Sequence, residues 1–417
     1  MVEKKVLFAA FRSQCHGLTA IPLSLIFCLL FFTTSQAENS TSPTSRTLSP
    51  VQAFNTIIGT QTITPRYQFT SQTRLVETAE GIHQMGSNIL KIALDPSFSK
   101  QYKIPENPKI QNLTDLVSRE PSFRRVFDMP FATYILWTYP FASCNWKDGL
   151  SESERHSQYD EIYALTRHLL TTYNGTHKRF LFGHWEGDWW LLGHSDPKKD
   201  PTPEAIQGMT DWYNVRQDAI EAARRDTPHH DVEVYQYAEV NLGQKALDGG
   251  ITVANHVLPH TRVDYVSYSC YDALNFGQEG NAVSPTFRAI LDHLESRLPA
   301  KPGLTGKRVF IGEFGFPLET SKTPQFQAER ARDTLCAAIE WGCPYVLYWQ
   351  YYCNEAKEGG ADARGFWMVD NKGAAQPVRD LYLQYYRKAH VFVEEEVQKT
   401  GCPPDGAVFQ NQAQQFL

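Results

Sequence analysis

The chain has 417 residues and a formal net charge of −6, with 42% hydrophobic and 21% charged residues. This composition excludes an intrinsically disordered protein, a collagen-like protein and a small disulfide scaffold. The acidic balance also argues against nucleic acid as the main partner, since phosphate backbones select basic surfaces. Aromatic residues are unusually frequent, with 24 Phe, 20 Tyr and 9 Trp. An excess of rings indicates either a bulky core or a binding surface.

The first 37 residues have the pattern of an export signal. Basic residues up to Arg12 precede an uncharged, mostly apolar run over residues 18–32, and Ser-Gln-Ala at 35–37 supplies the small residues of a cleavage point. The apolar run is shorter than the roughly 20 residues that a membrane-spanning helix needs. We therefore expect a cleaved signal peptide over 1–37 rather than an uncleaved anchor. The mature protein is expected to be secreted or periplasmic, without stable membrane insertion.

Six cysteines remain after the predicted cleavage, and an even number in an exported protein permits disulfides. No Cys/His spacing resembles a zinc site, so we expect no metal and no cofactor. Residues 38–52 are predicted to form a Ser/Thr/Pro-rich linker, and no protein partner is predicted. The six cysteines are Cys144, Cys270, Cys336, Cys343, Cys353 and Cys402.

Past residue 53, short β-rich runs alternate with longer amphipathic ones. The β-rich runs are apolar through most of their length, which is typical of parallel strands covered on both faces. Helical patterns lie between them, and Ser151 with Glu154 forms a capping box that opens one helix. The predicted strands are 56–60, 88–94, 133–139, 180–185, 232–238, 263–269, 309–312 and 345–349.

Eight strands alternating with helices predict an α/β fold, a (β/α)8 TIM barrel that forms a single catalytic domain over residues 53–391. The alternative is an open doubly wound sheet. Such a sheet usually carries a Gly-rich phosphate turn after its first strand, and Gly59 to Thr62 does not form one. Residues 392–417 are expected to be an irregular C-terminal tail.

Two carboxylates stand where apolar strands stop, and barrel enzymes carry their active sites at the carboxyl ends of the strands. The fourth predicted strand runs into Glu186 and the seventh into Glu313, each beside glycine and large aromatic residues. Two acids on roughly opposite sides of a barrel mouth can face each other across a small substrate. One can protonate a leaving oxygen while the other attacks the anomeric carbon, which is the arrangement that glycosidic bond cleavage needs.

Three segments carry a family resemblance. Ile311 to Gly315 (IGEFG) resembles the nucleophile strand of clan A glycoside hydrolases, the retaining barrel enzymes that include cellulases and mannanases. Tyr345 to Gln350 (YVLYWQ) is similar to strand 8 of that clan. Gly365 to Asp370 (GFWMVD) resembles the segment that precedes its last helix.

The resemblance implies roles for individual residues. Glu186 would be the acid/base and Glu313 the nucleophile, because the clan places these groups after strands 4 and 7. Trp349 would floor the subsite next to the scissile bond. Tyr268 or Tyr271, after strand 6, would be the tyrosine that hydrogen-bonds the nucleophile in many members.

The chain departs from the clan at two positions. The acid/base glutamate is commonly preceded by an asparagine that binds the sugar 2-hydroxyl, and here that position is Trp185. Many members have an arginine near the end of strand 2, where this chain offers Lys91. Lysine keeps the charge but loses the planar fork that binds a carboxylate bidentately. Both changes indicate a divergent family.

Other residues at the strand ends have competing interpretations. Asp188 is an alternative acid if the loop after strand 4 turns differently. Glu239, after strand 5, is expected to contact the substrate or support a residue that does. His184 is either a core histidine or a substrate contact, and strand alternation puts it on the same face as Glu186, within reach of a hydrogen bond.

Tryptophans near the strand ends are candidate sugar platforms, because sugar rings stack their C–H faces on aromatic side chains. Besides Trp349, the candidates are Trp137, Trp185 and Trp189. The sequence thus predicts a secreted retaining glycoside hydrolase that acts on a poly- or oligosaccharide. The alternatives are a carbohydrate-binding barrel that does not cleave its ligand, and a transglycosidase that uses the same carboxylates.

Overall fold

The computed structural model describes residues 47–277, 279–360 and 362–417. The predicted signal peptide over residues 1–37 lies outside the described residues, as does most of the predicted linker. In the described part of the chain, no helix is long and apolar enough to cross a membrane.

Within these residues, eight parallel strands close into a barrel in sequence order. Closure is achieved by β1 and β8, which pair in parallel with Gly59 opposite Leu347. The predicted (β/α)8 barrel is therefore confirmed, and the open doubly wound sheet is excluded because such a sheet leaves two edge strands unpaired. The strands are β1 (Ile58–Gln61), β2 (Ile89–Leu94), β3 (Thr133–Thr138), β4 (Lys178–Gly183), β5 (Val232–Val240), β6 (Tyr265–Ser269), β7 (Val309–Phe314) and β8 (Val346–Tyr348).

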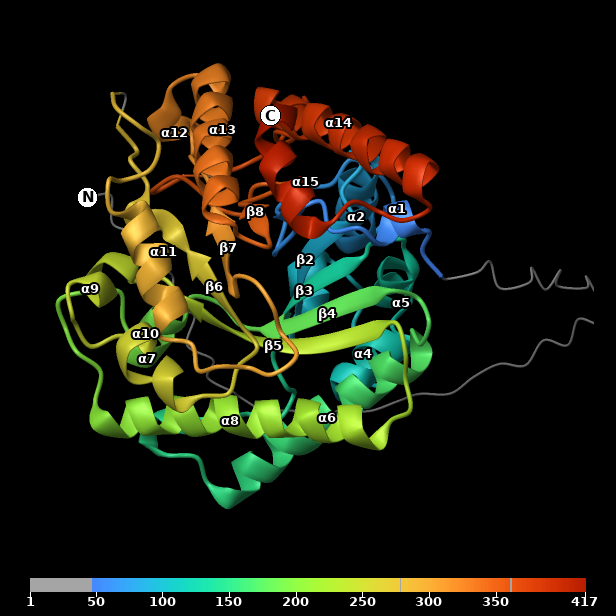
Figure 1. Cartoon of the computed structure of the whole chain (residues 1–417). Helices are drawn as coiled ribbons and strands as arrows, with labels where there is room; N and C mark the ends of the chain where they lie inside the picture. Colours follow the sequence, from blue (N-terminus) through green and yellow to red (C-terminus); the bar gives the residue numbers. More distant parts are fainter. Residues whose placement is uncertain (1–46, 278, 361) are drawn as a thin grey trace, which may run out of the picture. The chain divides into compact units, whose positions relative to one another are not determined.

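Helices connect the strands and cover the outside of the barrel (Figure 1). α6 and α8 run side by side along one flank, and α13 packs against α14 on another. α6 begins at the predicted capping box, in which the Glu154 N–H donates to the Ser151 hydroxyl and the Ser151 N–H donates to the Glu154 carboxylate. The helices are α1 (Pro50–Ala53), α2 (Arg74–Gln84), α3 (Phe98–Tyr102), α4 (Leu113–Arg119), α5 (Pro121–Asp128), α6 (Glu152–Thr172), α7 (Gly187–Leu192), α8 (Pro203–Asp226), α9 (Gly243–Leu247), α10 (Val253–His256), α11 (Phe287–Ser296), α12 (Leu318–Ser321), α13 (Pro324–Trp341), α14 (Pro377–Thr400) and α15 (Gly406–Ala413).

Alternation along the strands sorts their side chains into two apolar layers. Outward-facing residues such as Leu90, Leu136 and Phe182 pack in the large core between the strands and the helices. Inward-facing residues such as Ile135 and Leu181 pack in a second core inside the barrel. Because the interior is filled, a site on this barrel has to lie where the inner core ends, at the mouth.

β7 contains one residue more than its neighbours. The consecutive residues Tyr268 and Ser269 of β6 pair with Ile311 and Glu313, so Gly312 is left over. The register between β7 and β8 shifts at the same place. An extra residue of this kind is a β-bulge, which bends the strand and re-aims the side chain beside it.

The bulge directs Glu313 into the barrel. Phe310 packs in the inner core and Ile311 in the outer one, so regular alternation would turn Glu313 outward with Ile311. Instead, Glu313 contacts Lys91 on the inner face of β2. Gly312 also faces inward, where a β-carbon would lie 1.7 Å from the Ser267 hydroxyl oxygen, so this position accepts only glycine.

The expectation of an irregular tail over residues 392–417 is wrong. α14 runs past this point to Thr400, and α15 follows it. The Phe409 ring of α15 lies 4.9 Å from the Phe54 ring, and Phe392 packs against Phe416. The six cysteines named above are all free thiols. This segment is therefore held on the barrel by the burial of aromatic rings and not by a disulfide at Cys402.

The predicted linker over residues 38–52 also extends too far. Ser49 forms a capping box with Gln52, and Pro50 occupies the first position of α1. The Asn88 side chain then donates to the Gln52 carbonyl oxygen at 3.1 Å, which ties this turn to the start of β2. The polar composition that suggested a linker here belongs to a helix cap.

The close approach at the bulge makes a stability prediction. Gly312→Ala forces a methyl group into the Ser267 hydroxyl, and overpacking of this kind costs about 1–3 kcal/mol of unfolding free energy. Gly406→Ala is the matched control, because nothing lies within 4 Å of the added carbon at that position. Urea denaturation of both variants checks the prediction, and equal midpoints would contradict the packing at Gly312.

Candidate active site at the barrel mouth

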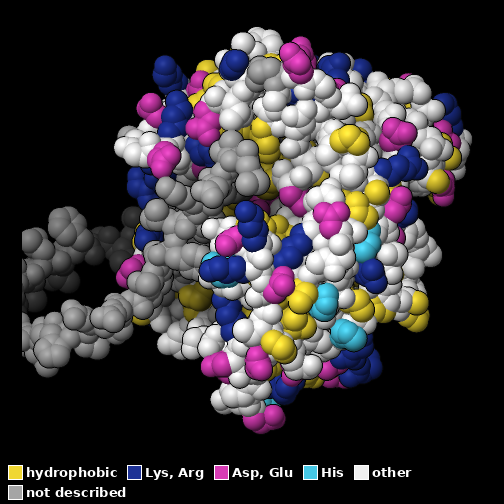
Figure 2. Space-filling view, turned by 90° about the vertical axis from the view of Figure 1, so that its left-hand side faces the viewer, with side chains coloured by type: hydrophobic (Ala, Val, Ile, Leu, Met, Phe, Trp, Pro, Cys, Tyr) yellow, Lys and Arg dark blue, Asp and Glu magenta, His cyan; other side chains and the backbone are white. Residues whose placement is uncertain are grey.

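The strands open on the side of the barrel that carries α7, α9 and α11, at the left of Figure 1. Figure 2 looks onto this side, where acidic, basic and hydrophobic side chains are interspersed. β4 ends at Gly183, and the chain turns through His184 and Trp185 to Glu186, the residue that precedes α7. Glu186 is 2% exposed and Glu313 is 1% exposed. Both predicted carboxylates are therefore buried at the ends of their strands.

Lys91 pairs with Glu313 at the mouth. Its Nζ lies 3.2 Å from Glu313 Oε1, and it also donates to the Gly312 carbonyl oxygen at 3.1 Å. The Gln61 side chain approaches the same carbonyl at 3.4 Å. The carbonyl at the bulge is thus satisfied by side chains of β1 and β2, as a buried carbonyl requires. Lys91, predicted as a site residue, therefore lies beside Glu313 at the mouth.

Glu239 is a second carboxylate beside Lys91. Its Oε2 lies 3.5 Å from Lys91 Nζ, and its side chain has no exposed surface. Ser267 and Ser269, which alternate on the inner face of β6, donate to its two oxygens at 3.1 and 2.5 Å. Glu239 therefore supports Lys91 instead of facing solvent. Neither serine was predicted as a site residue, although polar residues alternating within an apolar strand were the signal for them.

Of the two candidate tyrosines, Tyr271 faces the carboxylates. Burial raises its pKa well above the usual value, and the negative charges of Glu313, Glu355 and Glu186 raise it further. Tyr268 packs in the outer core instead, and its hydroxyl donates to Asp272 at 2.5 Å. Tyr268 was predicted as a possible site residue, and its placement on the outward face of β6 contradicts that.

The loop after β8 adds a carboxylate that the sequence analysis missed. Glu355 accepts a hydrogen bond from the Trp349 indole at 2.9 Å and from Arg364 at 2.6 Å. The ring of Trp349 lies 6.2 Å from that of Trp137, and both belong to the inner core. Glu355 and Arg364 therefore fix the edge of the predicted sugar platform. A glutamate six residues after the platform tryptophan was the only sequence signal.

The predicted platforms divide between the mouth and the surrounding core. Trp137 and Trp185 contact the inner core, and Trp367 joins them from the loop after β8. Trp189 of α7 is half-buried. Other tryptophans near the strand ends have a packing role, because Trp146, Trp190 and Trp212 pack against one another in tilted and edge-to-face arrangements in the outer layer. The aromatic excess therefore serves both the mouth and the core.

His184 is a core histidine. Its ring is stacked on Trp190 and packs against Trp212 and Tyr213. Nδ1 lies 2.7 Å from the Trp185 carbonyl oxygen, so Nδ1 carries the proton and Nε2 accepts from the Tyr213 hydroxyl. The predicted contacts of His184 with the substrate and with Glu186 are replaced by these bonds. The predicted shared face of His184 and Glu186 is lost because the strand ends at Gly183, before either residue.

Asp188 is occupied by main-chain donors. It accepts hydrogen bonds from the N–H groups of Asn241, Leu242 and Val253 at 2.8–3.1 Å. Burial raises its pKa, and these three amides oppose that rise. A carboxylate held in this way ties α7 to the segment after β5. The geometry therefore favours Glu186 over Asp188 as the acid.

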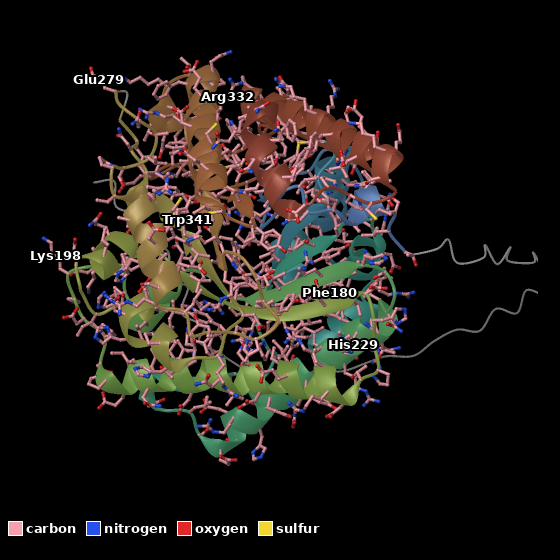
Figure 3. All side chains as sticks on the ribbon, in the orientation of Figure 1. Phe180, Lys198, His229, Glu279, Arg332 and Trp341 are labelled. Carbon is pink, nitrogen blue, oxygen red and sulfur yellow. The ribbon has the colours of Figure 1, made fainter. Side chains whose placement is uncertain are left out.

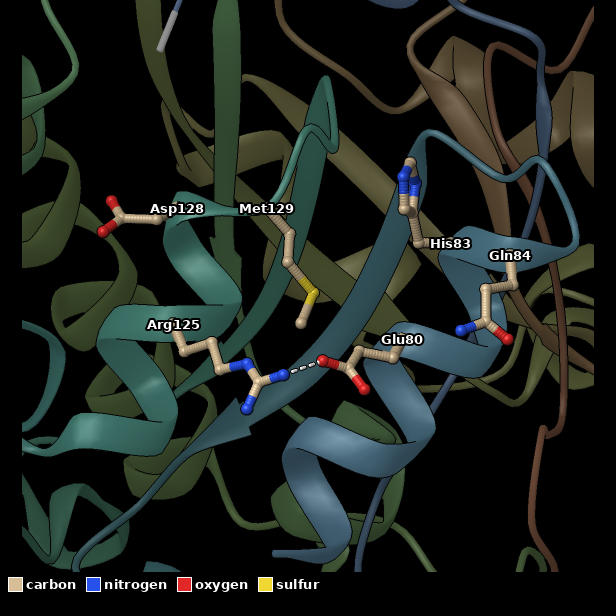
Figure 4. A pocket seen from close by; sticks show the side chains of 6 residues that line it. All are labelled: Glu80, His83, Gln84, Arg125, Asp128 and Met129. Carbon is tan, nitrogen blue, oxygen red and sulfur yellow. Dashed lines mark hydrogen bonds and ion pairs between the residues drawn. The ribbon is translucent and has the colours of Figure 1, made fainter. Parts of the chain in front are cut away.

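Two other features lie away from the mouth. A hollow of about 530 Å³ lies between α2 and α5, where Glu80 pairs with Arg125 (Figure 4). None of the predicted site residues lines it. His229 lies near the end of the barrel opposite Lys198, which follows α7 on the mouth side (Figure 3). Neither feature shares residues with the carboxylate cluster at the mouth, which consists of Glu239 and Glu313 around Lys91.

Metal binding receives no support from the geometry of the described stretches. They contain no group of three or more His, Cys, Asp or Glu side chains that could hold a metal ion. The charges at the mouth are instead arranged around the Lys91 ammonium. What the cluster offers chemically is a set of carboxylates in which Glu313 is paired with a cation.

No protein-family model and no curated protein sequence matches the chain. Solved structures do match. One is a GH5_18 protein from Streptomyces cattleya in complex with Manβ1-4GlcNAc, with a TM-score of 0.53, 12% identity and 80% of each chain covered. Another is a GH5_18 protein from Bifidobacterium longum subsp. infantis, with a TM-score of 0.52, 14% identity, and 80% of this chain and 78% of that chain covered. The predicted resemblance to clan A-like glycoside hydrolases is thus confirmed in the fold.

The buried histidine makes a prediction for pH dependence. Burial lowers the pKa of His184 to about 3, below the 6.5 expected in the unfolded chain. Below pH 6.5 the unfolded chain binds a proton at His184 that the buried ring does not bind. His184 therefore does not lower the free energy of unfolding above pH 6.5, and it lowers that free energy progressively as the pH falls towards 3. Between pH 6.5 and 4.5 the loss amounts to about 2 kcal/mol.

The test compares unfolding free energies at these two pH values in His184→Gln, which cannot titrate, and in the parent protein. The variant is expected to lose less stability on acidification. His156→Gln is the control, because that side chain is 70% exposed. A parent and a His184 variant with equal pH dependence would contradict the buried neutral ring.

Proposed function

We propose that the protein is a retaining glycoside hydrolase. The observation that carries the proposal is that Glu186 and Glu313 are both buried at the carboxyl ends of β4 and β7, where both act electrostatically on Tyr271. Glycosidic bond cleavage by double displacement needs two such carboxylates, one to donate a proton and one to form a covalent bond. The similarity of the fold to glycoside hydrolase structures also supports this proposal.

In the first step, a carboxylate oxygen of Glu313 attacks the anomeric carbon. The bond from that carbon to the glycosidic oxygen breaks, and the proton of Glu186 moves to the departing oxygen. Lys91 orients the attacking carboxylate through its contact with Oε1. As the acid, Glu186 would have to be protonated, and its burial in the protein favours the protonated form of a carboxyl group.

In the second step, Glu186 acts as a base. It takes a proton from water, the water oxygen attacks the anomeric carbon, and the ester bond to Glu313 breaks. Interception of the same ester by a sugar hydroxyl would make the protein a transglycosidase. Trp349, with its indole fixed by Glu355, would carry the sugar ring in either reaction.

The decisive experiment begins with a polysaccharide and oligosaccharide panel, starting from β-mannosides because of the Manβ1-4GlcNAc bound by the Streptomyces protein. Glu313→Ala is expected to lower turnover at least about 10⁴-fold, because the covalent step is lost. Added azide should restore turnover and yield a glycosyl azide. Glu340→Gln on α13, 68% exposed, is the control and should keep full activity.

Unchanged turnover in Glu313→Ala would overturn the mechanism. Glycan binding without release of reducing ends, equal in the parent and in the Glu186 and Glu313 variants, would instead favour a carbohydrate-binding barrel. The replacement of the expected asparagine by Trp185 is the observation that keeps this second function under test.

The proposed acid makes a separate prediction. Glu186→Ala should lose most turnover on natural glycosides but retain it on aryl glycosides whose leaving group departs without a proton. The loss should therefore grow with the pKa of the leaving group when kcat/KM is measured across a series of aryl glycosides. Equal losses across that series would show that Glu186 does not donate the proton.

A further inference from the structure

Glu239 is a buried carboxylate that the double displacement does not use. It lies on β5 two residues after Tyr237, on the same inner face, and none of its side chain is exposed. A buried ionised group is retained only when charges or hydrogen bonds compensate its loss of hydration. Its surroundings therefore indicate what it does.

Three groups compensate Glu239. Ser269 donates to one carboxylate oxygen at 2.5 Å and Ser267 to the other at 3.1 Å, while Lys91 Nζ lies 3.5 Å away. Donors that favour the ionised form keep a carboxylate charged. Lys91 thus stands between two carboxylates, Glu239 on β5 and Glu313 on β7, and is shared by both.

We propose that Glu239 is a positioning residue that holds Lys91 against Glu313 throughout the reaction. The inference rests on the proposed role of Glu313 as the nucleophile. When Glu313 forms the glycosyl ester it loses its negative charge, and Lys91 would then be a buried cation without an anion if Glu313 were its only counterion. Glu239 supplies that anion, so Lys91 stays in place until hydrolysis of the ester restores the charge on Glu313.

The same arrangement sets the charge that Glu313 experiences. Lys91 favours its ionised form, and Glu239 opposes it as a second negative charge shared with the same cation. Among the other titratable groups, Tyr237 on β5 and Cys270 and Tyr271 after β6 interact electrostatically with Glu313, and Glu186 after β4 and Glu355 after β8 act on the same Tyr271. Burial raises the pKa of the two tyrosines and of Cys270 well above their usual values, so these three stay neutral during a titration of Glu313.

Removing a negative charge and removing a positive charge should therefore move the acidic limb of the pH profile of kcat/KM in opposite directions. Glu239→Gln removes a negative charge and should move the limb down by about one pH unit. Lys91→Met removes the positive charge and should move it up by about one unit or more. A residue that only maintains the fold would lower activity without moving the limb.

The double variant Lys91→Met/Glu239→Gln provides the sharpest comparison. It removes both charges together, so it leaves no unpaired ammonium and should fold even if the single variants do not. If the charges of Glu239 and Lys91 offset each other at Glu313, the acidic limb of the double variant should return close to that of the parent. If Glu239 is inert towards Glu313, the double variant should show the full upward shift expected for Lys91→Met, and the proposal is overturned. Glu233→Gln, at the opposite end of β5, is the matched control and should leave the limb unchanged.

A titration without substrate separates this inference from the proposed function. The Glu313 carboxyl is followed by NMR in protein carrying ¹³C-labelled glutamate and assigned by comparison with Glu313→Gln. The same opposite shifts support the coupling even if no glycan is cleaved, in which case only the proposed function fails. Active protein whose Glu313 titration does not respond to Glu239→Gln or to the double variant would remove the inference and leave the hydrolase proposal standing.

Discussion

A single buried ammonium group organises the mouth of this barrel. Lys91 has no exposed side-chain surface and lies within 3.5 Å of carboxylates on two other strands. An ammonium taken out of water is costly unless anions and acceptors surround it. β2, β5 and β7 must therefore present their polar groups to one point, and the bulge at Gly312 is what brings Glu313 there.

The bulge, the lysine and the serines form one structural unit. Gly312 leaves room for Ser267, and Ser267 in turn donates to Glu239. The carbonyl at the bulge accepts a hydrogen bond from Lys91. Each group thus satisfies another that the barrel interior would otherwise leave unpaired, which is why a polar cluster of this size can sit above a tightly packed apolar core.

Aromatic residues serve two different purposes in this chain. Trp137 and Trp349 meet at the mouth, where Glu355 orients the Trp349 indole. Trp190 and Trp212 instead enclose His184 outside the barrel and keep it neutral. The same residue types occur after the same strands, and only their side-chain directions separate the proposed sugar platform from tryptophans that pack in the core. Composition could therefore not distinguish the two.

Local patterns in the sequence predicted the strands of the barrel and the carboxylates that follow β4 and β7, because burial period and strand ends are properties of short segments. They could not choose between Tyr268 and Tyr271, since the chain leaves β6 at Ser269 and alternation stops there. They also missed Glu355, whose place at the mouth results from the path of a long loop.

The amino-acid sequence by itself thus determined the fold class and the residue types available at the mouth. The tertiary structure decided which of them meet. Strand register, the bulge at Gly312 and the pairing of Lys91 with Glu313 and Glu239 depend on hydrogen bonds and ion pairs between strands more than 40 residues apart. Such long-range pairing is set by closure of the barrel and leaves no local pattern in any one strand.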